Sequence, residues 1–230
     1  MAERRLLYCI TDRSGLSGGQ FPGDELACGR VLLYKIAEAA RAGVDYIQLR
    51  EKDLSTRELE QLAHEAVSLI RELRTEDPEL RTRLLINSRT DVALAVGADG
   101  VHLRADDVSV SEVRLVVRRA EHCRCPESND RFVVAVSCHT VGDVARAESE
   151  GADLVVFAPV FGKKDAPGVI PQGLATLSEA CRAQIPVLAL GGVTIENASA
   201  CLEAGAAGIA GIRLFQENKI SDVVGAIRSF

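Results

Sequence analysis

Short runs of aliphatic and β-branched residues alternate along the chain with longer amphipathic stretches rich in Ala, Leu, Glu and Arg. Short apolar runs bounded by turn signals predict buried strands, and strands that alternate with helical patterns predict parallel βαβ units. We expect strands at residues 6–10, 45–49, 83–86, 100–103, 132–136, 154–158, 186–190 and 208–212.

The amphipathic stretches predict helices at residues 26–42, 56–74, 89–96, 109–121, 141–150, 173–183, 195–204 and 218–228. Ser55 and Thr140 stand where N-cap residues are expected. A Gly-[Val/Ala]-[Asp/Ala] turn recurs at 43–45, 97–99, 151–153 and 205–207. Glycine at such a position ends a helix in a left-handed cap, and the short loop then leads into the next strand.

Eight strands alternating with eight helices predict a single-domain (β/α)8 TIM barrel over residues 1–230. An open doubly wound sheet is the alternative, because sequence cannot show closure of the sheet. In a barrel, the active site lies in the loops at the carboxyl ends of the strands.

Composition narrows the classes of function. The chain has a net charge of −6, and its 27 basic residues are spread without a long run, so nucleic acid is not an expected partner. The first apolar run is too short for a signal peptide or a membrane span. Seven cysteines without framework spacing suit reduced thiols, and we expect a cytoplasmic protein.

The loop after the second predicted strand contains Gln48, Arg50 and Lys52. Alternation along a strand places Gln48 and Arg50 on the same side, so an amide and two cations can reach the barrel mouth. Arginine binds phosphate oxygens with a planar fork, and lysine acts as a point charge. A charged surface loop is an equally weighted interpretation of this stretch alone.

Further polar residues follow the third and fourth predicted strands. Asn87 and Ser88 come after the third, and Asp106 and Asp107 come after the fourth. The two acids suit either a cation site or the N-terminus of the next helix, and Asn87 suits a turn or cap. Magnesium typically takes one or two carboxylates together with substrate phosphates and water.

The remaining strand ends favour an anionic ligand. Ser137 can donate to an anion, and His139 can act as a general acid or base. The sixth loop is basic, with Lys163 and Lys164. Paired glycines at a strand-to-helix turn let backbone N–H groups approach a phosphate, and barrels often bind phosphate in their last two loops. The glycines here are Gly191 and Gly192, and Arg213 ends the eighth strand.

These residues belong to motifs that extend over nearly the whole chain: QLREK (48–52), GADGVHL (97–103), VSCHT (136–140), APVF (158–161), LGGVT (190–194) and GAAGIAGI (205–212). In these motifs the chain resembles the thiamine-phosphate synthase family and the related thiazole tautomerase family. The resemblance implies a barrel that condenses hydroxymethylpyrimidine diphosphate with thiazole phosphate and releases pyrophosphate. The substitution is expected to be dissociative, through a carbocation-like pyrimidine.

The resemblance also implies roles for particular residues. The pyrimidine diphosphate would be bound by Gln48, Arg50, Glu51, Lys52, Asn87, Ser137, Lys163 and Lys164, and the thiazole phosphate by Gly191, Gly192, Ile212 and Arg213. Catalytic roles would fall to Lys52, Ser137, His139 and Lys164.

The cofactor that the resemblance implies is Mg²⁺, bound by Asp107 with Ser88 and Asp106 as further ligands. Ser88 stands where the family has a first acid, and the loop of the fourth strand reads His-Leu-Arg-Ala-Asp-Asp instead of His-Leu-Gly-Gln-[Glu/Asp]-Asp. A neutral hydroxyl is a weaker ligand than a carboxylate, so we expect lower magnesium affinity unless Asp106 joins the ion or Arg104 and Arg213 supply charge at the phosphates.

Two other functions stay open. One is an isomerase like the thiazole tautomerases, in which His139 would carry a proton without a metal. The other is a non-catalytic protein that binds a phosphate ligand. In each case the expected partners are small phosphate compounds rather than nucleic acid or membrane, and the resemblance also allows a homodimer.

Overall fold

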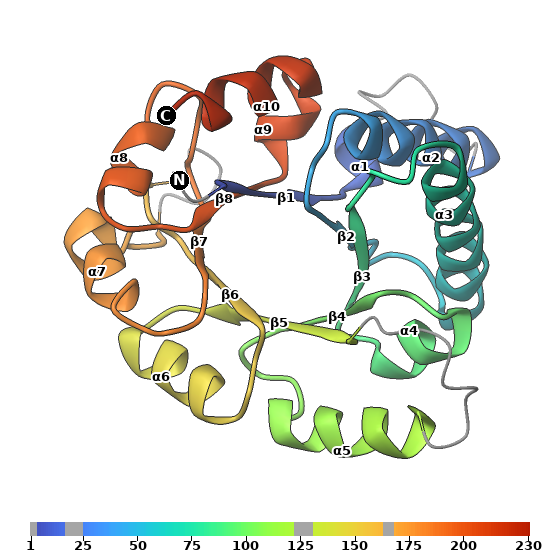
Figure 1. Ribbon diagram of the computed structural model, residues 1–230, viewed down its shortest axis with the longest axis horizontal. Coiled ribbons are helices and arrows are strands. Elements are labelled where there is room, and N and C mark those ends of the chain that lie inside the picture. Colours follow the sequence, from blue (N-terminus) through green and yellow to red (C-terminus); the bar gives the residue numbers. More distant parts are fainter. Residues whose placement is uncertain (1–3, 17–24, 122–130, 163–167) are drawn as a thin grey trace.

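Eight parallel strands form a closed barrel, in which each strand pairs with the next and β8 pairs with β1 (Figure 1). The computed structural model describes residues 4–16, 25–121, 131–162 and 168–230. The strands are β1 (Leu6–Ile10), β2 (Tyr46–Leu49), β3 (Arg83–Asn87), β4 (Gly100–Leu103), β5 (Val133–Cys138), β6 (Leu154–Phe157), β7 (Val187–Ala189) and β8 (Gly208–Gly211). The predicted single-domain (β/α)8 barrel is confirmed, and the open sheet is excluded.

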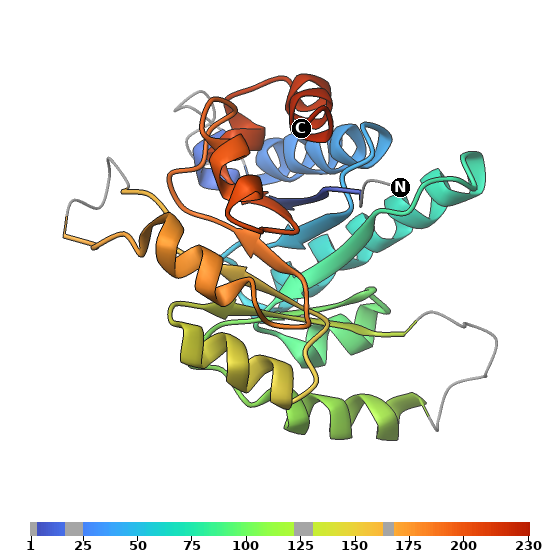
Figure 2. The ribbon, with the colours of Figure 1, turned by 60° about the vertical axis from the view of Figure 1, so that its left-hand side comes forward.

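Helices surround the barrel on all sides and cover the outer faces of the strands (Figures 1 and 2). They are α1 (Arg13–Leu16), α2 (Glu25–Arg41), α3 (Thr56–Glu76), α4 (Thr90–Val96), α5 (Val110–Glu121), α6 (Val141–Ser149), α7 (Gly173–Ala180), α8 (Ala198–Glu203), α9 (Arg213–Gln216) and α10 (Ile220–Arg228). The eight predicted helices are present with shifted ends. The sequence missed α1 and α9, because four residues are too few to show a helical period. Within the described ranges, no helix is long and apolar enough to span a bilayer.

Local signals explain several helix ends. Ser55 and Thr140 both form capping boxes, the first with Glu58 and the second with Asp143. Gly97 ends α4 in the left-handed conformation, as the recurrent turn predicts. These short-range contacts determine where α3 and α6 begin and where α4 ends.

The inside of the barrel is a small apolar core of its own. It contains Tyr8, Ile10, Leu85, Val133, Ala135, Leu154, Val156, Leu188 and Ala210. Side chains alternate along a strand, so the residues two positions beyond Leu85 and Ala135 also face inward. These are Asn87 and Ser137, and they lie at the carboxyl ends of their strands.

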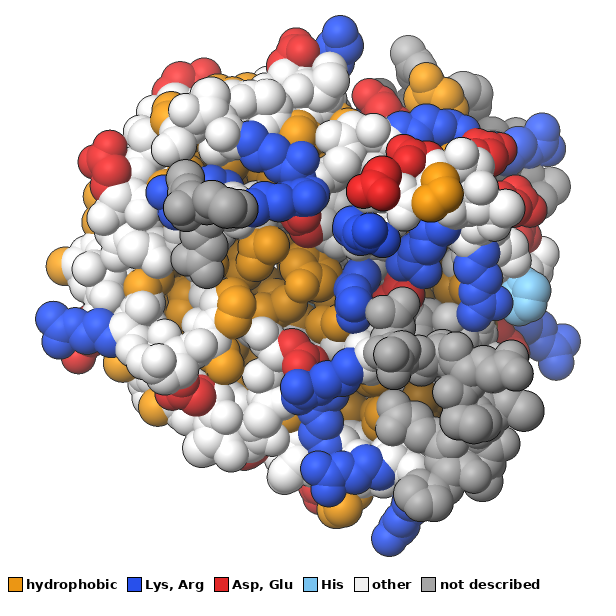
Figure 3. All heavy atoms as spheres, viewed as in Figure 1, with side chains coloured by type: hydrophobic (Ala, Val, Ile, Leu, Met, Phe, Trp, Pro, Cys, Tyr) orange, Lys and Arg blue, Asp and Glu red, His pale blue; other side chains and the backbone are white. Residues whose placement is uncertain are grey.

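Three aspartates close the opposite end of the barrel, each immediately before an even-numbered strand. Asp45, Asp99 and Asp153 accept hydrogen bonds from the backbone amides of Leu7, Leu84 and Val134, at 2.9, 2.7 and 2.7 Å. Each also pairs with at least one arginine. Figure 3 shows this end, where basic side chains lie around an apolar centre. The fourth turn has Ala207 instead of an acid.

Replacing Asp153 with alanine should lower the free energy of unfolding by about 2 kcal/mol. The change removes the acceptor of the Val134 amide and leaves Arg114 and Arg131 without their shared carboxylate. Urea unfolding followed by circular dichroism measures the loss. Glu79→Ala is the control, because the Glu79 side chain is 89% exposed and should cost less than about 0.5 kcal/mol. Equal losses in the two variants would contradict a structural role for Asp153.

Candidate active site

An amide pair forms the floor of the barrel mouth at the ends of β2 and β3. Gln48 Nε2 donates to Asn87 Oδ1 at 2.8 Å. Gln48 is only 2% exposed, and its Oε1 has no hydrogen-bond partner among the described residues. Because buried carbonyl oxygens are normally satisfied, this oxygen is placed to accept an N–H from a ligand.

A hydrogen-bonded chain of side chains crosses the barrel beside this pair. The Tyr8 hydroxyl lies 2.7 Å from His102 Nδ1, and His102 Nε2 lies 2.8 Å from Ser137 Oγ. Burial, together with the positive charge of Arg50, lowers the pKa of His102 to about 3, so the ring is neutral. The sequence motif contained His102, but we predicted no role for it. Its signal is a histidine at an inward-facing position of β4.

The loop after β2 is held against β1 by a buried acid. Glu51 accepts hydrogen bonds from the Thr11 hydroxyl at 2.5 Å and from the Arg13 backbone amide at 2.9 Å. Burial raises the pKa of Glu51. Thr11 Oγ1 also accepts from the Arg50 amide at 2.9 Å, which fixes the backbone from which the Arg50 side chain leaves.

The two predicted cations of this loop differ in their surroundings. Arg50 is half-buried and directly follows β2, at the carboxyl end of the barrel, and its positive charge contributes to the lowered pKa of His102. Lys52 is exposed. Glu51, predicted to bind substrate, has its carboxylate turned toward Thr11 and Arg13. Sequence reasoning missed Thr11 and Arg13, because their contact with Glu51 spans about forty positions.

The predicted magnesium ligands lie after β3 and β4. Ser88 has a left-handed backbone, with φ of 60°, and its amide donates to His102 O at 2.8 Å. Asp107 Oδ2 accepts from the Arg104 amide at 2.7 Å, and Asp106 pairs with the Arg104 guanidinium. Asp106 is exposed, and this ion pair holds its pKa below the usual range.

The chemistry of these donors tests whether they fit the ion. Across the described segments, no group of three or more His, Cys, Asp or Glu side chains is placed to hold a metal. Asp107 offers one carboxylate, Ser88 a neutral hydroxyl, and Asp106 a carboxylate already paired with Arg104. This set fits a magnesium ion that takes most of its other ligands from substrate phosphates and water.

His139 begins the loop after β5 and is exposed. Its Nδ1 is 2.7 Å from the carbonyl oxygen of Ala158, so Nδ1 carries the hydrogen and Nε2 is the basic nitrogen of the neutral ring. The ring is thus oriented by the neighbouring loop, as a proton carrier requires. The two predicted lysines of that loop, Lys163 and Lys164, lie outside the described residues.

The glycine pair after β7 packs directly against the loop after β6. Gly191 and Gly192 have φ of 95° and 66°. A Cβ on Gly191 would lie 2.7 Å from Pro159 Cα, and one on Gly192 would lie 2.7 Å from Gly162 O. Both positions therefore require glycine, because the loop after β6 fills the space that a side chain would need.

The end of β8 lies beside this glycine turn, since β7 and β8 are paired neighbours. Ile212 is the N-cap of α9, and Arg213 is the first residue of that helix and is exposed. The structure thus brings the predicted residues of the seventh and eighth loops to one side of the mouth, and Gln48, Arg50 and Asn87 to another.

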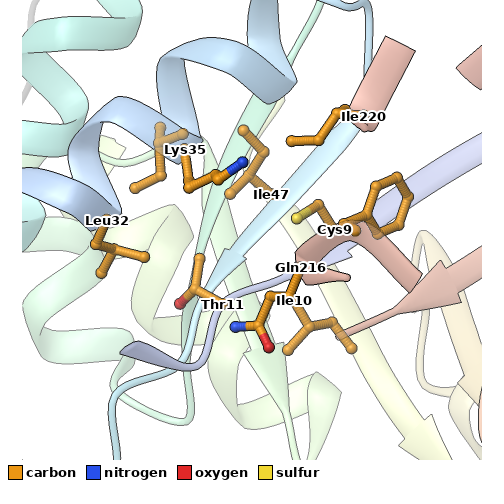
Figure 4. Close-up of a pocket in the computed structure, with 10 residues that line it drawn as sticks. Cys9, Ile10, Thr11, Leu32, Lys35, Ile47, Gln216 and Ile220 are labelled. Atoms are coloured by element: carbon orange, nitrogen blue, oxygen red, sulfur yellow. The ribbon is translucent and has the colours of Figure 1, made fainter. Parts of the chain in front are cut away.

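A cavity of about 20 Å³ lies beside β1 and near α2 and α10 (Figure 4). Cys9, Ile47 and Ile220 line it, together with Lys35 and Gln216 at its edge. Burial raises the pKa of the Cys9 thiol to about 12, so the thiol is unreactive at neutral pH. None of the predicted site residues lines this cavity, although Thr11, which accepts from the Arg50 amide, does.

Comparisons with known proteins agree with the barrel and its motifs. A family model described as thiamine monophosphate synthase matches residues 23–215. The thiamine-phosphate synthase of Methanoculleus marisnigri is 39% identical over 97% of this chain and 92% of its own length. That of Clostridium novyi is 35% identical over 97% and 95%. The structure of thiamine phosphate pyrophosphorylase from Pyrococcus furiosus has a TM-score of 0.74 and 27% identity, covering 99% of this chain and 95% of that one.

Proposed function

This chain belongs to the thiamine monophosphate synthase family, and we propose that it joins hydroxymethylpyrimidine diphosphate to thiazole phosphate, forming thiamine phosphate and pyrophosphate. The observation that carries the proposal is the Gln48–Asn87 pair, with Arg50 directly after the strand that ends beside Gln48. It combines an unpaired buried acceptor for a heterocycle N–H with a cation for a diphosphate. The reaction makes the protein a transferase.

The residues at the mouth support a substitution in which the diphosphate leaves before the new bond forms. Arg50 and Lys52 stabilise the negative charge that develops on the leaving diphosphate. Gln48 Oε1 accepts a hydrogen from the pyrimidine amino group and so orients the ring whose CH₂ group becomes cationic. The thiazole nitrogen then forms the C–N bond, and no nucleophile from the protein is needed.

The second substrate is proposed to lie across the mouth, with its phosphate at the glycine pair. Gly191 and Gly192 form a tight turn after β7 with φ of 95° and 66°, and Ile212 and Arg213 follow the neighbouring strand β8. This arrangement separates the two phosphate groups, so the thiazole nitrogen can face the pyrimidine carbon. Substrate positioning of this kind supplies a large part of the rate enhancement in two-substrate reactions.

Magnesium is proposed as the cofactor, held by Asp107 with Ser88 and, after release from Arg104, Asp106. The bound ion would neutralise charge on the leaving diphosphate. Because Asp107 is the one carboxylate among these three ligands that forms no ion pair with another described residue, the affinity for the free ion should be low, and most binding should depend on the diphosphate.

Changing Ser88 to aspartate should tighten magnesium binding at least about tenfold, because a second carboxylate is added beside Asp107. Aspartate tolerates the left-handed backbone of this position, whose φ is 60°. Isothermal titration with Mg²⁺ in the presence of pyrophosphate measures the change. Ser88→Asn is the control, since it keeps the shape without the charge. An unchanged magnesium affinity in Ser88→Asp would place the ion elsewhere.

The function is tested by supplying both substrates, with and without Mg²⁺, and measuring thiamine phosphate by chromatography. We expect product that depends on both substrates and on Gln48, with Gln48→Met as the inactive variant. No product under either condition would overturn the proposal. Conversion of a thiazole carboxylate phosphate that is lost in His139→Ala would instead support the tautomerase alternative, which the orientation of the His139 ring favours.

A homodimer and a cytoplasmic location stay predictions.

A further inference from the structure

The chain of hydrogen bonds through His102 runs from the middle of the barrel to its mouth. Tyr8 has no exposed surface, His102 is 2% exposed, and Ser137 is half-buried at the end of β5. Both ring nitrogens of His102 are engaged by hydroxyl groups, at 2.7 and 2.8 Å. A hydroxyl can donate or accept, so the direction of each bond depends on which ring nitrogen of His102 carries the hydrogen.

Tyr8 determines the direction. Burial raises the pKa of Tyr8 well above its ordinary value, so the phenol keeps its hydrogen. A buried O–H requires an acceptor, and among the described residues His102 Nδ1 is the one that lies within reach. If Nδ1 carried a hydrogen instead, two donors would face each other and the Tyr8 hydrogen would be unsatisfied.

The neutral imidazole has one N–H, and with Nδ1 accepting from Tyr8 that hydrogen is on Nε2. Nε2 therefore donates to Ser137 Oγ, and the Ser137 hydroxyl hydrogen is left to donate toward the mouth. We propose that Tyr8 and His102 are positioning residues that make the Ser137 hydroxyl a donor to an anionic oxygen of the bound ligand. The identity of that ligand as a diphosphate rests on the proposed function.

The orientation has a consequence for ligand choice. A phosphate or diphosphate oxygen only accepts hydrogen bonds, so it is complementary to a serine that is constrained to donate. With the opposite tautomer, Ser137 would donate to His102 and present lone pairs to the anion, which is repulsive. Buried Tyr8 and His102 thus determine that the Ser137 hydroxyl donates its hydrogen bond toward the mouth.

The first test needs no ligand. Ring-¹⁵N-labelled protein is examined by NMR at neutral pH, and the His102 signals are identified by their loss in His102→Gln. We expect the chemical shifts and couplings of the Nε2–H tautomer. Observation of the Nδ1–H tautomer, or of a protonated ring, would overturn the proposal whether or not thiamine phosphate is formed.

The second test is a double-mutant cycle on the binding of inorganic pyrophosphate, measured by isothermal titration in magnesium buffer. Ser137→Ala should weaken binding about tenfold through loss of a charge-assisted hydrogen bond. Tyr8→Phe should weaken it about fivefold, since the imidazole then loses the bond that holds its orientation. The double variant should bind like Ser137→Ala, because Tyr8 acts only through Ser137.

Two outcomes separate this proposal from the proposed function. If the fold-losses of pyrophosphate affinity in Tyr8→Phe and Ser137→Ala multiply in the double variant, the two residues act independently. That result would overturn the positioning role alone. Absence of pyrophosphate binding in the unaltered protein would overturn the anion-facing role and the proposed function together. Tyr34→Phe is the matched control, because Tyr34 is 68% exposed on α2 and should leave binding unchanged. If Tyr8→Phe does not fold, the tautomer in the unaltered protein still decides.

Discussion

Replacement of Arg50 with methionine should lower kcat/KM for thiamine phosphate formation by about a hundredfold or more. Arg50 follows β2 at the carboxyl end of the barrel, and Thr11 holds its backbone in place. Methionine keeps most of the side-chain length but removes the charge that stabilises the departing diphosphate. Steady-state kinetics with both substrates at varied concentration measures the loss.

Two further variants show whether the loss of kcat/KM comes from the Arg50 side chain itself or from the change in net charge. Arg50→Lys keeps the charge without the planar fork, so its rate should fall between those of the unaltered protein and Arg50→Met. Arg81→Met removes an arginine whose side chain is 66% exposed in the loop before β3, at the opposite end of the barrel, and should leave kcat/KM unchanged. A similar loss in both methionine variants would mean that net charge, rather than Arg50 itself, controls the rate.

Lowering the pH from 7.5 to 5.0 should cost about 2 kcal/mol of folding stability through His102 alone. Its pKa is about 3 in the folded chain against an ordinary 6.5, so between these values the unfolded chain binds more protons. Stability therefore rises with pH through this window and falls as the solution is acidified below about 6.5. Urea unfolding at the two pH values gives the difference in free energy.

His102→Gln separates this contribution from those of other groups. Glutamine does not titrate, so the variant should be less sensitive to acid by about 2 kcal/mol, although its stability at pH 7.5 is also lower. His64→Gln is the matched control, because His64 is exposed on α3 in the folded chain as it is in the unfolded one. An identical pH dependence in His102→Gln and the unaltered protein would show that His102 is not held neutral by burial.

The order of strands and helices was predictable because its signals are local. Apolar runs, capping residues such as Ser55 and Thr140, and recurrent glycine turns each act over a few positions, and they determined the order of the strands and helices. The ends shifted where a turn continues a helical pattern: α8 begins at Ala198 rather than 195, after Asn197 accepts from the Thr194 amide. Closure of the sheet joins β1 to β8, and no local signal carries it.

The residues of the candidate site were predictable from their places at strand ends, but the hydrogen bonds between their side chains were not. Tyr8 and His102 are 94 positions apart, and Gln48 and Asn87 are 39 apart. Such pairs become neighbours only through the register of the closed barrel. For the same reason Glu51 was read as part of a substrate-binding motif, while its bonds to Thr11 and Arg13 were visible only in three dimensions.

The three aspartates that precede β2, β4 and β6 lie at the end of the barrel away from the proposed chemistry. A five-residue strand spans about 17 Å, and residues more than about 10 Å apart usually change stability independently. Substitutions in the ligand loops, such as serine at position 88, therefore leave the aspartate network unstrained. The proposed recognition of metal and phosphate at one rim can therefore change without disturbing the hydrogen bonds and ion pairs of the aspartates at the other.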